Sequence, residues 1–460
     1  MQKQSLNVQD LRERVRGEIL LPGGAEYEGA RKVWNAMIDR RPAVIVRCTA
    51  TPDVVATVNF ARDERLPLAV RGGGHNVAGA ALCDDGVVLD LSRMKTVTVD
   101  APARRASVQA GALLSDVDAA TQAHGLAVPL GINSTTGVAG LTLGGGFGWT
   151  SRKLGMTVDN LESAEVVTAA GEVVRASATE HPDLFWALRG GGGNFGVVTR
   201  FDFRLHPLGP EVLSGLIVFP IAGARSVLQR YREFAASAPD ELSAWIVMRK
   251  APPLPFLPQD VHGKGILVVA LCYAGPPAEG QRYADQLRRL GTPVGEHVGV
   301  QPYAGWQQAF DPLLAPGARN YWKSQNFTSL PDALFDTLLA QVEKLPGPEC
   351  EIFIAALGGA MARAAADSTA YAQRDALFLM NVHGRWADPK DDARGIAWSR
   401  EVFRAVAPFA TGGVYVNFLT EDEGDRVRAA YGRNYGRLAQ VKRAYDPANL
   451  FRVNFNVRPA

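Results

Sequence analysis

The chain has few cysteines and almost no net charge. Among its 460 residues there are four cysteines, and no two of them form a C-x-x-C pair. Cysteines so far apart are typical of free thiols in a reducing compartment, which predicts a cytoplasmic protein without a disulfide framework. A formal net charge of +2 gives no basis for a nucleic-acid partner or for binding to an anionic membrane surface.

Long hydrophobic runs are also absent. No apolar run reaches the ~18 residues that a membrane span needs, and Met1 to Arg16 lacks the apolar core of a signal peptide. Histidine is scarce as well, and the five histidines other than His75 and His383 show no spacing typical of a metal site. We therefore expect neither a membrane protein nor a metalloprotein.

The remaining composition is typical of a globular protein with two domains. Hydrophobic residues make up 47% of the chain and charged residues 21%, and a chain of this length exceeds one ordinary core. We expect an α+β fold, with a first domain built from residues 1–208 and 409–460 and a second domain from residues 209–408. The second domain should be a sheet backed by helices, because strand-like and helical patterns alternate there. Its expected strands lie at 212–219, 244–249, 265–273, 350–357 and 376–383, and its expected helices at 221–236, 277–290 and 331–344.

A histidine stands among glycines in the segment Arg71-Gly72-Gly73-Gly74-His75-Asn76-Val77-Ala78-Gly79. Glycine lets the backbone approach a flat ligand closely and reach positive φ at little cost. A histidine in this setting faces the ligand that the glycines hold. The segment predicts a cofactor tether, with a buried, hydrogen-bonded histidine as the alternative.

Two further segments are rich in glycine. Residues 135–149 contain six glycines and several hydroxyl groups, and unblocked backbone N–H groups of this kind bind anions such as phosphate. A tightly packed helix–sheet crossing is the alternative there. Residues 191–196 fit G-x-G-x-x-G, but the strand-like sequence 197–203 follows where a nicotinamide dinucleotide site requires a helix. We therefore expect ligand-binding loops, but not a Rossmann nicotinamide site.

The chain resembles the FAD-linked oxidoreductases of the berberine bridge enzyme type, within the vanillyl-alcohol oxidase and p-cresol methylhydroxylase superfamily. The resemblance rests on Arg71 to Gly79, Gly131 to Trp149, Leu184 to Thr199, and Tyr445-Asp446-Pro447 running to Asn454-Phe455-Asn456. In length and C-terminus the chain is most similar to the bacterial 6-hydroxy-D-nicotine oxidase branch. The resemblance implies the two-domain FAD-binding fold of the p-cresol methylhydroxylase type, with a substrate domain of antiparallel sheet backed by helices.

The resemblance also implies how FAD is bound. His75 would be joined to the 8α-methyl carbon of the flavin, and Asn133 stands where many relatives have a cysteine that forms a second bond. A single covalent link is therefore expected. Thr136 stands where relatives that use oxygen well often have a small aliphatic residue, which weighs against efficient use of oxygen. The residues expected to bind FAD are Arg71, Gly72, Gly73, Gly74, His75, Asn76, Gly79, Asn133, Thr135, Thr136, Gly137, Gly140, Leu141, Gly145, Gly146, Gly148, Trp149, Gly196, Val198, Asn417, Asn454 and Asn456.

Flavin oxidases of this type take a hydride from a C–H bond beside oxygen or nitrogen, while a base removes the proton of the hydroxyl or amine. Tyr415 is the first candidate, in a segment (413–418) that resembles the family's strand at the flavin. A tyrosine has an unperturbed pKa of about 10, so its neighbours would have to lower it. His383 is the second candidate, in a stretch that resembles the strand carrying a catalytic glutamate in some plant relatives. An ordinary structural role is the alternative for each.

We therefore expect an FAD-dependent oxidase of a small or medium organic alcohol or amine. It would pass electrons to molecular oxygen, release hydrogen peroxide, and exist as a monomer or homodimer. A carbohydrate oxidase acting at an anomeric hydroxyl is one alternative, and a flavin dehydrogenase or flavin-binding protein with poor oxygen use is another. Five aromatic residues are candidates to line the substrate pocket, with packing in the core as the alternative for each: Trp245, Tyr303, Trp306, Tyr321 and Trp322.

Overall fold

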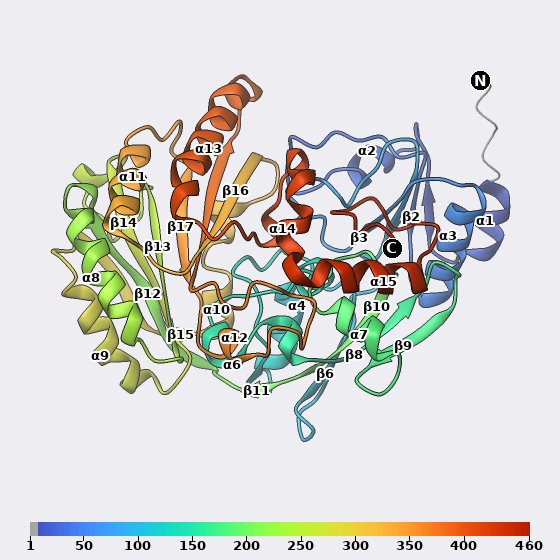
Figure 1. Ribbon diagram of the computed structural model, residues 1–460, viewed down its shortest axis with the longest axis horizontal. Coiled ribbons are helices and arrows are strands. Elements are labelled where there is room, and N and C mark those ends of the chain that lie inside the picture. Colours follow the sequence, from blue (N-terminus) through green and yellow to red (C-terminus); the bar gives the residue numbers. More distant parts are fainter. Residues whose placement is uncertain (1–7) are drawn as a thin grey trace.

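The first part of the chain forms two sheets (Figure 1). The computed structural model describes residues 8–460. A four-stranded sheet has the order β1-β2-β4-β3, with β1 (Glu18–Leu20), β2 (Val44–Arg47), β3 (Leu68–Arg71) and β4 (Val87–Asp90). A five-stranded antiparallel sheet has the order β5-β6-β10-β8-β9, with β5 (Val97–Asp100), β6 (Arg105–Gln109), β8 (Leu161–Val167), β9 (Val173–Ser177) and β10 (Val197–Arg204). Two short strands, β7 (Leu126–Ala127) and β11 (His206–Pro207), pair separately.

The helices of this part connect and cover the two sheets. They are α1 (Val8–Arg14), α2 (Tyr27–Ala30), α3 (Thr51–Asp63), α4 (Leu114–Gln122), α5 (Val138–Leu143), α6 (Ser151–Leu154) and α7 (Pro182–Leu188). α3 connects β2 to β3 along the chain, and both strands pair in parallel with β4, which lies between them in the sheet. Pro52 stands in the first turn of α3, where a missing N–H costs nothing. β3 ends at Arg71, so the glycine–histidine segment leaves the carboxyl end of a parallel strand, where open α/β sheets bind ligands.

The second part of the chain forms one antiparallel sheet of seven strands, in the order β15-β12-β14-β13-β17-β18-β16. Its strands are β12 (Glu211–Pro220), β13 (Leu242–Lys250), β14 (Gly265–Tyr273), β15 (Gly295–Pro302), β16 (Arg319–Phe327), β17 (Glu351–Ala356) and β18 (Phe378–Trp386). Its main helices are α8 (Ala224–Ser237), α9 (Pro277–Arg288), α11 (Asp332–Val342) and α13 (Asp392–Val406), which cover the outer face (Figure 1). Two shorter helices, α10 (Tyr303–Gln307) and α12 (Ala360–Arg363), lie toward the first part.

Alternation along the strands divides this sheet into two faces. On β13, Leu242, Ala244, Ile246 and Met248 pack against the helices, in one large core. Trp245 points the other way, into a cluster that it shares with Phe147 and Tyr415 from outside this sheet. The inner face of the sheet is therefore the wall that meets the first part of the chain.

The end of the chain returns to the first part. α14 (Val427–Tyr431) and α15 (Tyr435–Tyr445) follow the second part, and α15 lies beside α7. One core combines residues from 11–205 with Ala370 and residues from 414–457, whereas the buried residues of a second core all lie within 213–406. The α+β fold and the antiparallel sheet backed by helices are confirmed. The domain boundaries at 208–209 and 408–409 remain a prediction, which these two cores support.

Several elements differ from expectation. The segment 413–418 is not a strand, because Val416–Phe418 forms a short 3-10 turn that brings Tyr415 and Asn417 to the inner wall. The helices α14 and α15 are separated at Gly432, which has a φ of 48°. The strands β15 and β16 and the helix α13 were not predicted. All four cysteines are free and buried, and no helix within residues 8–460 is long and apolar enough to cross a membrane.

Candidate active site

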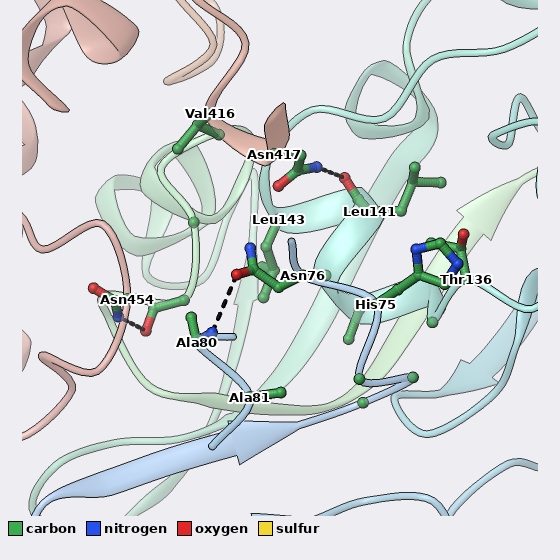
Figure 2. A pocket seen from close by; sticks show the side chains of 18 of the residues that line it. His75, Asn76, Ala80, Ala81, Thr136, Leu141, Leu143, Val416, Asn417 and Asn454 are labelled. Carbon is green, nitrogen blue, oxygen red and sulfur yellow. Dashed lines mark hydrogen bonds between the residues drawn. The ribbon is translucent and has the colours of Figure 1, made fainter. Parts of the chain in front are cut away.

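A single cavity of about 300 Å³ joins the glycine loops of the first part to the inner face of the second sheet. This volume is at the lower end for small-molecule sites. The residues that border it include no Asp, Glu, Lys or Arg. Sixteen predicted site residues do border it: Gly72, Gly73, Gly74, His75, Asn76, Asn133, Thr136, Gly137, Gly140, Leu141, Gly196, Val198, His383, Tyr415, Asn417 and Asn454. In Figure 2, His75 and Thr136 lie on one side of the view and Asn454 on the other.

His75 stands at the cavity wall as a neutral imidazole. Burial lowers its pKa to about 4, and the nearby charge of Arg385 acts in the same direction. The ring stacks on Trp34 with a centroid distance of 4.4 Å. Its Nε2 atom is buried and has no hydrogen-bond partner among the described residues. A buried nitrogen left without a partner is costly, so this atom marks a place where a bound group is expected.

The glycines of the cavity wall are of two kinds. A Cβ atom on Gly73 would lie 2.4 Å from the backbone nitrogen of Gly137, so the two loops can approach only as glycines. A Cβ atom on Gly140 or Gly193 would meet no protein atom within 4 Å. These two positions leave backbone open to the cavity, and Asn454 holds the second of them through a bond from its Nδ2 to the Gly193 carbonyl, at 3.0 Å (Figure 2).

Eight predicted FAD-binding residues do not border the cavity: Arg71, Gly79, Thr135, Gly145, Gly146, Gly148, Trp149 and Asn456. Two of them contact residues that do: the Thr135 hydroxyl donates to Oδ1 of Asn133 at 2.6 Å, and Trp149 stacks on Trp245 at 4.4 Å. These contacts indicate a supporting role for Thr135 and Trp149. The Arg71 guanidinium donates to the carbonyl of Ala30, which does not border the cavity.

Tyr415 is buried and accepts two hydrogen bonds at its hydroxyl oxygen. The backbone N–H of Gly146 and Nδ2 of Asn417 each donate to it at 3.0 Å. Burial nevertheless raises the pKa of Tyr415 to about 12. This is the opposite of the lowering that a tyrosine base requires, so the phenol stays protonated at neutral pH and its own hydrogen is free to be donated.

His383 lies on β18 and borders the cavity from the second sheet. Its Nδ1 lies 3.1 Å from Oε1 of Glu351, on the neighbouring strand β17. The second carboxylate oxygen of Glu351 accepts from Arg249 of β13 at 2.7 Å. The stretch 377–386 around His383 contains no carboxylate, and Glu351 lies 32 positions earlier in the chain. Only the strand pairing brings the two side chains together.

Aromatic rings form the walls around Tyr415 and His383. Phe147, Trp245, Trp322, Phe353 and Phe418 all border the cavity. Phe418 contacts Tyr415 edge-on at 4.9 Å, and Trp322 stacks on His383 at 4.5 Å. Trp245 and Trp322 thus line the pocket as expected.

The other three candidate aromatic residues do not line the cavity. Tyr303 and Trp306 are packed in the cluster behind Trp149. The Tyr321 hydroxyl donates to Asp422 at 2.6 Å, on the side of the sheet that the helices cover. Strand alternation explains this last difference, since Tyr321 and Trp322 are adjacent and must face opposite sides.

Asn133 stands where many relatives would have the cysteine that forms a second bond to the flavin. It borders the cavity, and no cysteine does. The four cysteine thiols are buried elsewhere, and burial raises the pKa of the Cys48 and Cys272 thiols, which disfavours reactive thiolates. Within residues 8–460, no group of three or more His, Cys, Asp or Glu side chains could hold a metal ion.

Comparison with known proteins gives two family matches. The sequence matches the family described as "FAD binding domain" over residues 42–177 and the one described as "Berberine and berberine like" over residues 414–458. It is 32% identical over 457 residues to an FAD-linked oxidoreductase of Dictyostelium discoideum, which covers 98% of this chain and 97% of that protein.

Two further comparisons extend along almost the whole chain. The sequence is 30% identical over 463 residues to (R)-6-hydroxynicotine oxidase of Paenarthrobacter nicotinovorans, covering 97% of each protein. The crystal structure of 6-hydroxy-D-nicotine oxidase from Arthrobacter nicotinovorans superimposes with a TM-score of 0.85 at 28% identity, covering 97% of this chain and 98% of that one.

Proposed function

The chain belongs to the berberine and berberine-like FAD-linked oxidoreductases, and we propose that it oxidises an uncharged alcohol or amine that carries a flat or apolar group. It is an enzyme, FAD is its cofactor, and its fold is the two-domain FAD-binding fold of the p-cresol methylhydroxylase type, as the sequence predicted. One observation carries the proposal. The glycine loops with His75 and the aromatic walls with Tyr415 and His383 all border one cavity.

The cavity fits FAD by its chemistry. No cationic side chain borders it, so the diphosphate would be held by backbone N–H groups of the glycine loops, as in other anion-binding nests. Gly140 and Gly193 leave backbone open for that contact. His75, Thr136, Asn417 and Asn454 border the same cavity from four separate segments. We assign FAD to this cavity on these grounds.

We propose a single covalent link between His75 and the 8α carbon of FAD. The link needs an unprotonated imidazole, and His75 is neutral across the physiological range because burial lowers its pKa to about 4. Its unpartnered Nε2 supports a bound group at this ring. A new N–C bond would form as one methyl hydrogen and the imidazole N–H hydrogen are both lost as protons, and the two electrons released would reduce oxygen to hydrogen peroxide. Asn133 offers no thiol for a second bond.

The catalytic roles are assigned to two residues. When bound, FAD would supply the acceptor for the hydride of the substrate C–H bond and the route by which two electrons reach oxygen to give hydrogen peroxide. His383 takes the proton of the substrate hydroxyl or amine. Tyr415 donates a hydrogen bond to the same heteroatom, since two N–H donors already occupy its oxygen. This assignment reverses the first expectation, in which Tyr415 was preferred as the base.

The aromatic walls favour a flat or apolar substrate over a carbohydrate. A sugar presents a hydroxyl on nearly every carbon, and each one left unpaired in a buried site costs free energy. Around His383 the walls are mainly the rings of Trp245, Trp322, Phe353 and Phe418. A charged substrate is disfavoured as well, because no ionised side chain borders the cavity to pair with it. The similarity to (R)-6-hydroxynicotine oxidase supports a heteroaromatic amine as the first compound to test.

The function is tested by anaerobic bleaching of the flavin with benzylic alcohols, cyclic heteroaromatic amines and oligosaccharides, followed by exposure to air. We expect bleaching by an alcohol or amine, then rapid return of colour with release of peroxide. Bleaching by oligosaccharides alone would contradict the substrate class. Bleaching that persists in air would indicate a dehydrogenase.

The covalent link is tested by acid precipitation. Wild-type protein should keep its yellow colour in the pellet, whereas His75→Ala should release FAD to the supernatant. His124→Ala is the matched control, because His124 is exposed and distant from the cavity wall, and it should behave as wild type. Complete release of colour from wild-type protein would refute the link.

A further inference from the structure

Four residues form one row across the second sheet. Arg249 on β13 pairs with Glu351 on β17, Glu351 pairs with His383 on β18, and His383 pairs with Trp322 on β16. Residues that pair directly across antiparallel strands share one face. This row is therefore on the inner face of the sheet, and only its His383 and Trp322 end borders the cavity.

Each carboxylate oxygen of Glu351 has one partner in the row. Nδ1 of His383 lies 3.1 Å from Oε1 of Glu351, and Oε2 of Glu351 accepts from Arg249 at 2.7 Å. Arg249 is itself fixed by donating to the carbonyls of Pro348 and Lys250, at 3.2 Å and 3.3 Å. Both carboxylate oxygens are thus occupied by partners of defined direction.

The imidazole ring of His383 cannot turn freely between two aromatic rings. Trp322 stacks on it at 4.5 Å with an interplanar angle of 15°, and Phe353 meets it edge-on at 5.0 Å. The ring plane is therefore set by packing, and the choice of which nitrogen faces Glu351 is set by the hydrogen bond. No described residue hydrogen-bonds Nε2, which leaves that nitrogen for the cavity.

We propose that Glu351 and Arg249 are positioning residues that hold His383 as the Nδ1–H tautomer, so that its Nε2 lone pair accepts the substrate proton. The proposal rests on the proposed function, which supplies the substrate. Glu351 is suited to this task because it stays ionised. Although its burial would raise its pKa, the charges of Arg249 and Arg385 and the hydrogen bond from His383 hold that pKa below its usual range.

The proton balance of the step is simple. The hydroxyl or amine proton moves to Nε2 of His383, the C–H hydrogen leaves with its electron pair to FAD, and the substrate becomes a carbonyl or imine. The Nδ1 proton remains between His383 and Glu351, and the carboxylate stabilises the imidazolium that forms. Arg249 neutralises the same carboxylate when His383 is uncharged, so the buried charge is paired before and after the transfer.

The first test is the tautomer of His383 in the FAD-loaded enzyme. Proton–nitrogen correlation spectra of protein labelled with ¹⁵N-histidine contain seven histidines, and His383→Asn identifies the relevant signal. At pH 8 we expect Nδ1 protonated and Nε2 unprotonated in wild-type protein. In Glu351→Ala this preference should be lost. A wild-type signal with a proton on Nε2 would overturn the proposal, and this readout needs no substrate.

The second test is the rate of flavin reduction in single turnover, with whichever benzylic alcohol or cyclic amine bleaches wild-type protein fastest. Glu351→Gln should lower the rate constant at least about tenfold with little change in the substrate concentration for half-saturation, and Glu351→Asp should recover part of the loss. Glu349→Gln is the matched control, since Glu349 is a neighbouring carboxylate that is itself exposed and pairs with Arg385 rather than with His383. An unchanged rate in Glu351→Gln would refute the positioning role alone. If no donor bleaches wild-type protein, the proposed function fails. The tautomer measurement would still test whether Glu351 and Arg249 position His383.

Discussion

At the scale of single residues, the hydroxyl of Tyr415 shows how burial and hydrogen bonding act against each other. Two N–H donors stabilise its oxygen and favour the phenolate, but complete burial outweighs them and raises the pKa to about 12. The group is therefore a hydrogen-bond donor at every pH that the folded protein meets in a cell. Its two donors fix the oxygen in place and leave the hydroxyl hydrogen for the substrate.

This geometry predicts the effect of Tyr415→Phe. Flavin reduction should slow by about tenfold or more, and the free energy of unfolding should fall by about 1–3 kcal/mol, because Gly146 N–H and Asn417 Nδ2 lose their acceptor. Stopped-flow reduction and chemical unfolding measure the two effects. Tyr371→Phe, which changes a neighbouring tyrosine outside this cavity, should alter neither.

The same variant tests the protonation state of Tyr415. Because its pKa is about 12, the phenol does not titrate between pH 6 and pH 10. The rate of flavin reduction in Tyr415→Phe should therefore rise and fall with pH at the same pH values as in wild-type protein. A limb that is present in wild-type protein and disappears in this variant would show that Tyr415 acts as the base.

At the scale of elements, the contact of α4 with α10 contains a buried acid without a cationic partner. Asp118 on α4 accepts one long hydrogen bond, of 3.3 Å, from Gln307 on α10, and its Oδ1 has no partner among the described residues. Burial raises the pKa of Asp118 to about 7. This contact joins the two parts of the chain, since Gln307 also donates to the Gly131 carbonyl beside the cavity.

The raised pKa gives a pH-dependent stability. The unfolded chain releases the Asp118 proton near pH 4 and the folded protein near pH 7, so the stability that the protonated acid provides is complete below about pH 4 and is lost as pH rises to 7. Asp118→Asn cannot ionise, and its amide gives the unpaired Oε1 of Gln307 a donor.

We therefore expect Asp118→Asn to stabilise the protein at pH 8, by up to about 4 kcal/mol, and to change it little at pH 4.5. Thermal unfolding at the two pH values measures the difference. Asp63→Asn is the control, because Asp63 is exposed and should show no such pH dependence. Destabilisation at pH 8 would contradict the assignment of a buried acid without a compensating charge.

At the scale of the whole molecule, a buried ion pair fixes the return of the chain to its first part. Lys442 on α15 and Asp446 are both fully inaccessible to solvent. The three ammonium hydrogens of Lys442 reach the carbonyls of Asn194 and Phe451 and the carboxylate of Asp446, at 2.7, 2.8 and 2.7 Å. Asp446 also accepts from the backbone of residues 450 and 451. This one cluster holds the last segment against the glycine loop at 190–196.

Replacing Lys442 by Met should therefore affect folding and cofactor binding together. The change leaves the Asp446 carboxylate buried without its cation, which costs about 3–5 kcal/mol, and it frees the segment that carries Asn454. We expect a large loss in the free energy of unfolding and a lower FAD content in the purified protein. Lys344→Met is the matched control, because the Lys344–Glu401 pair is exposed and contributes little.

Local patterns in the sequence determined most of the elements and the cofactor-binding loops. Alternation of apolar residues predicted the central strands β12, β13 and β14, and the glycines predicted the loops that border the cavity. The sequence pattern does not predict the strand β16, because Asn320, Lys323 and Gln325 are polar and interrupt the apolar alternation. In the folded protein all three side chains are buried. They are buried because distant parts of the chain supply partners, such as Thr420 and Asp422 for Lys323.

What only the tertiary structure decided is the catalytic geometry. The sequence by itself singled out the segments of His75, Tyr415 and His383, because their surroundings along the chain are distinctive, and all three residues border the cavity. It could not show that Glu351 and Arg249 stand beside His383, since strand pairing joins residues that are 32 and 102 positions apart. Nor could it give the pKa direction of Tyr415, because that direction depends on how completely the folded protein removes water from the hydroxyl.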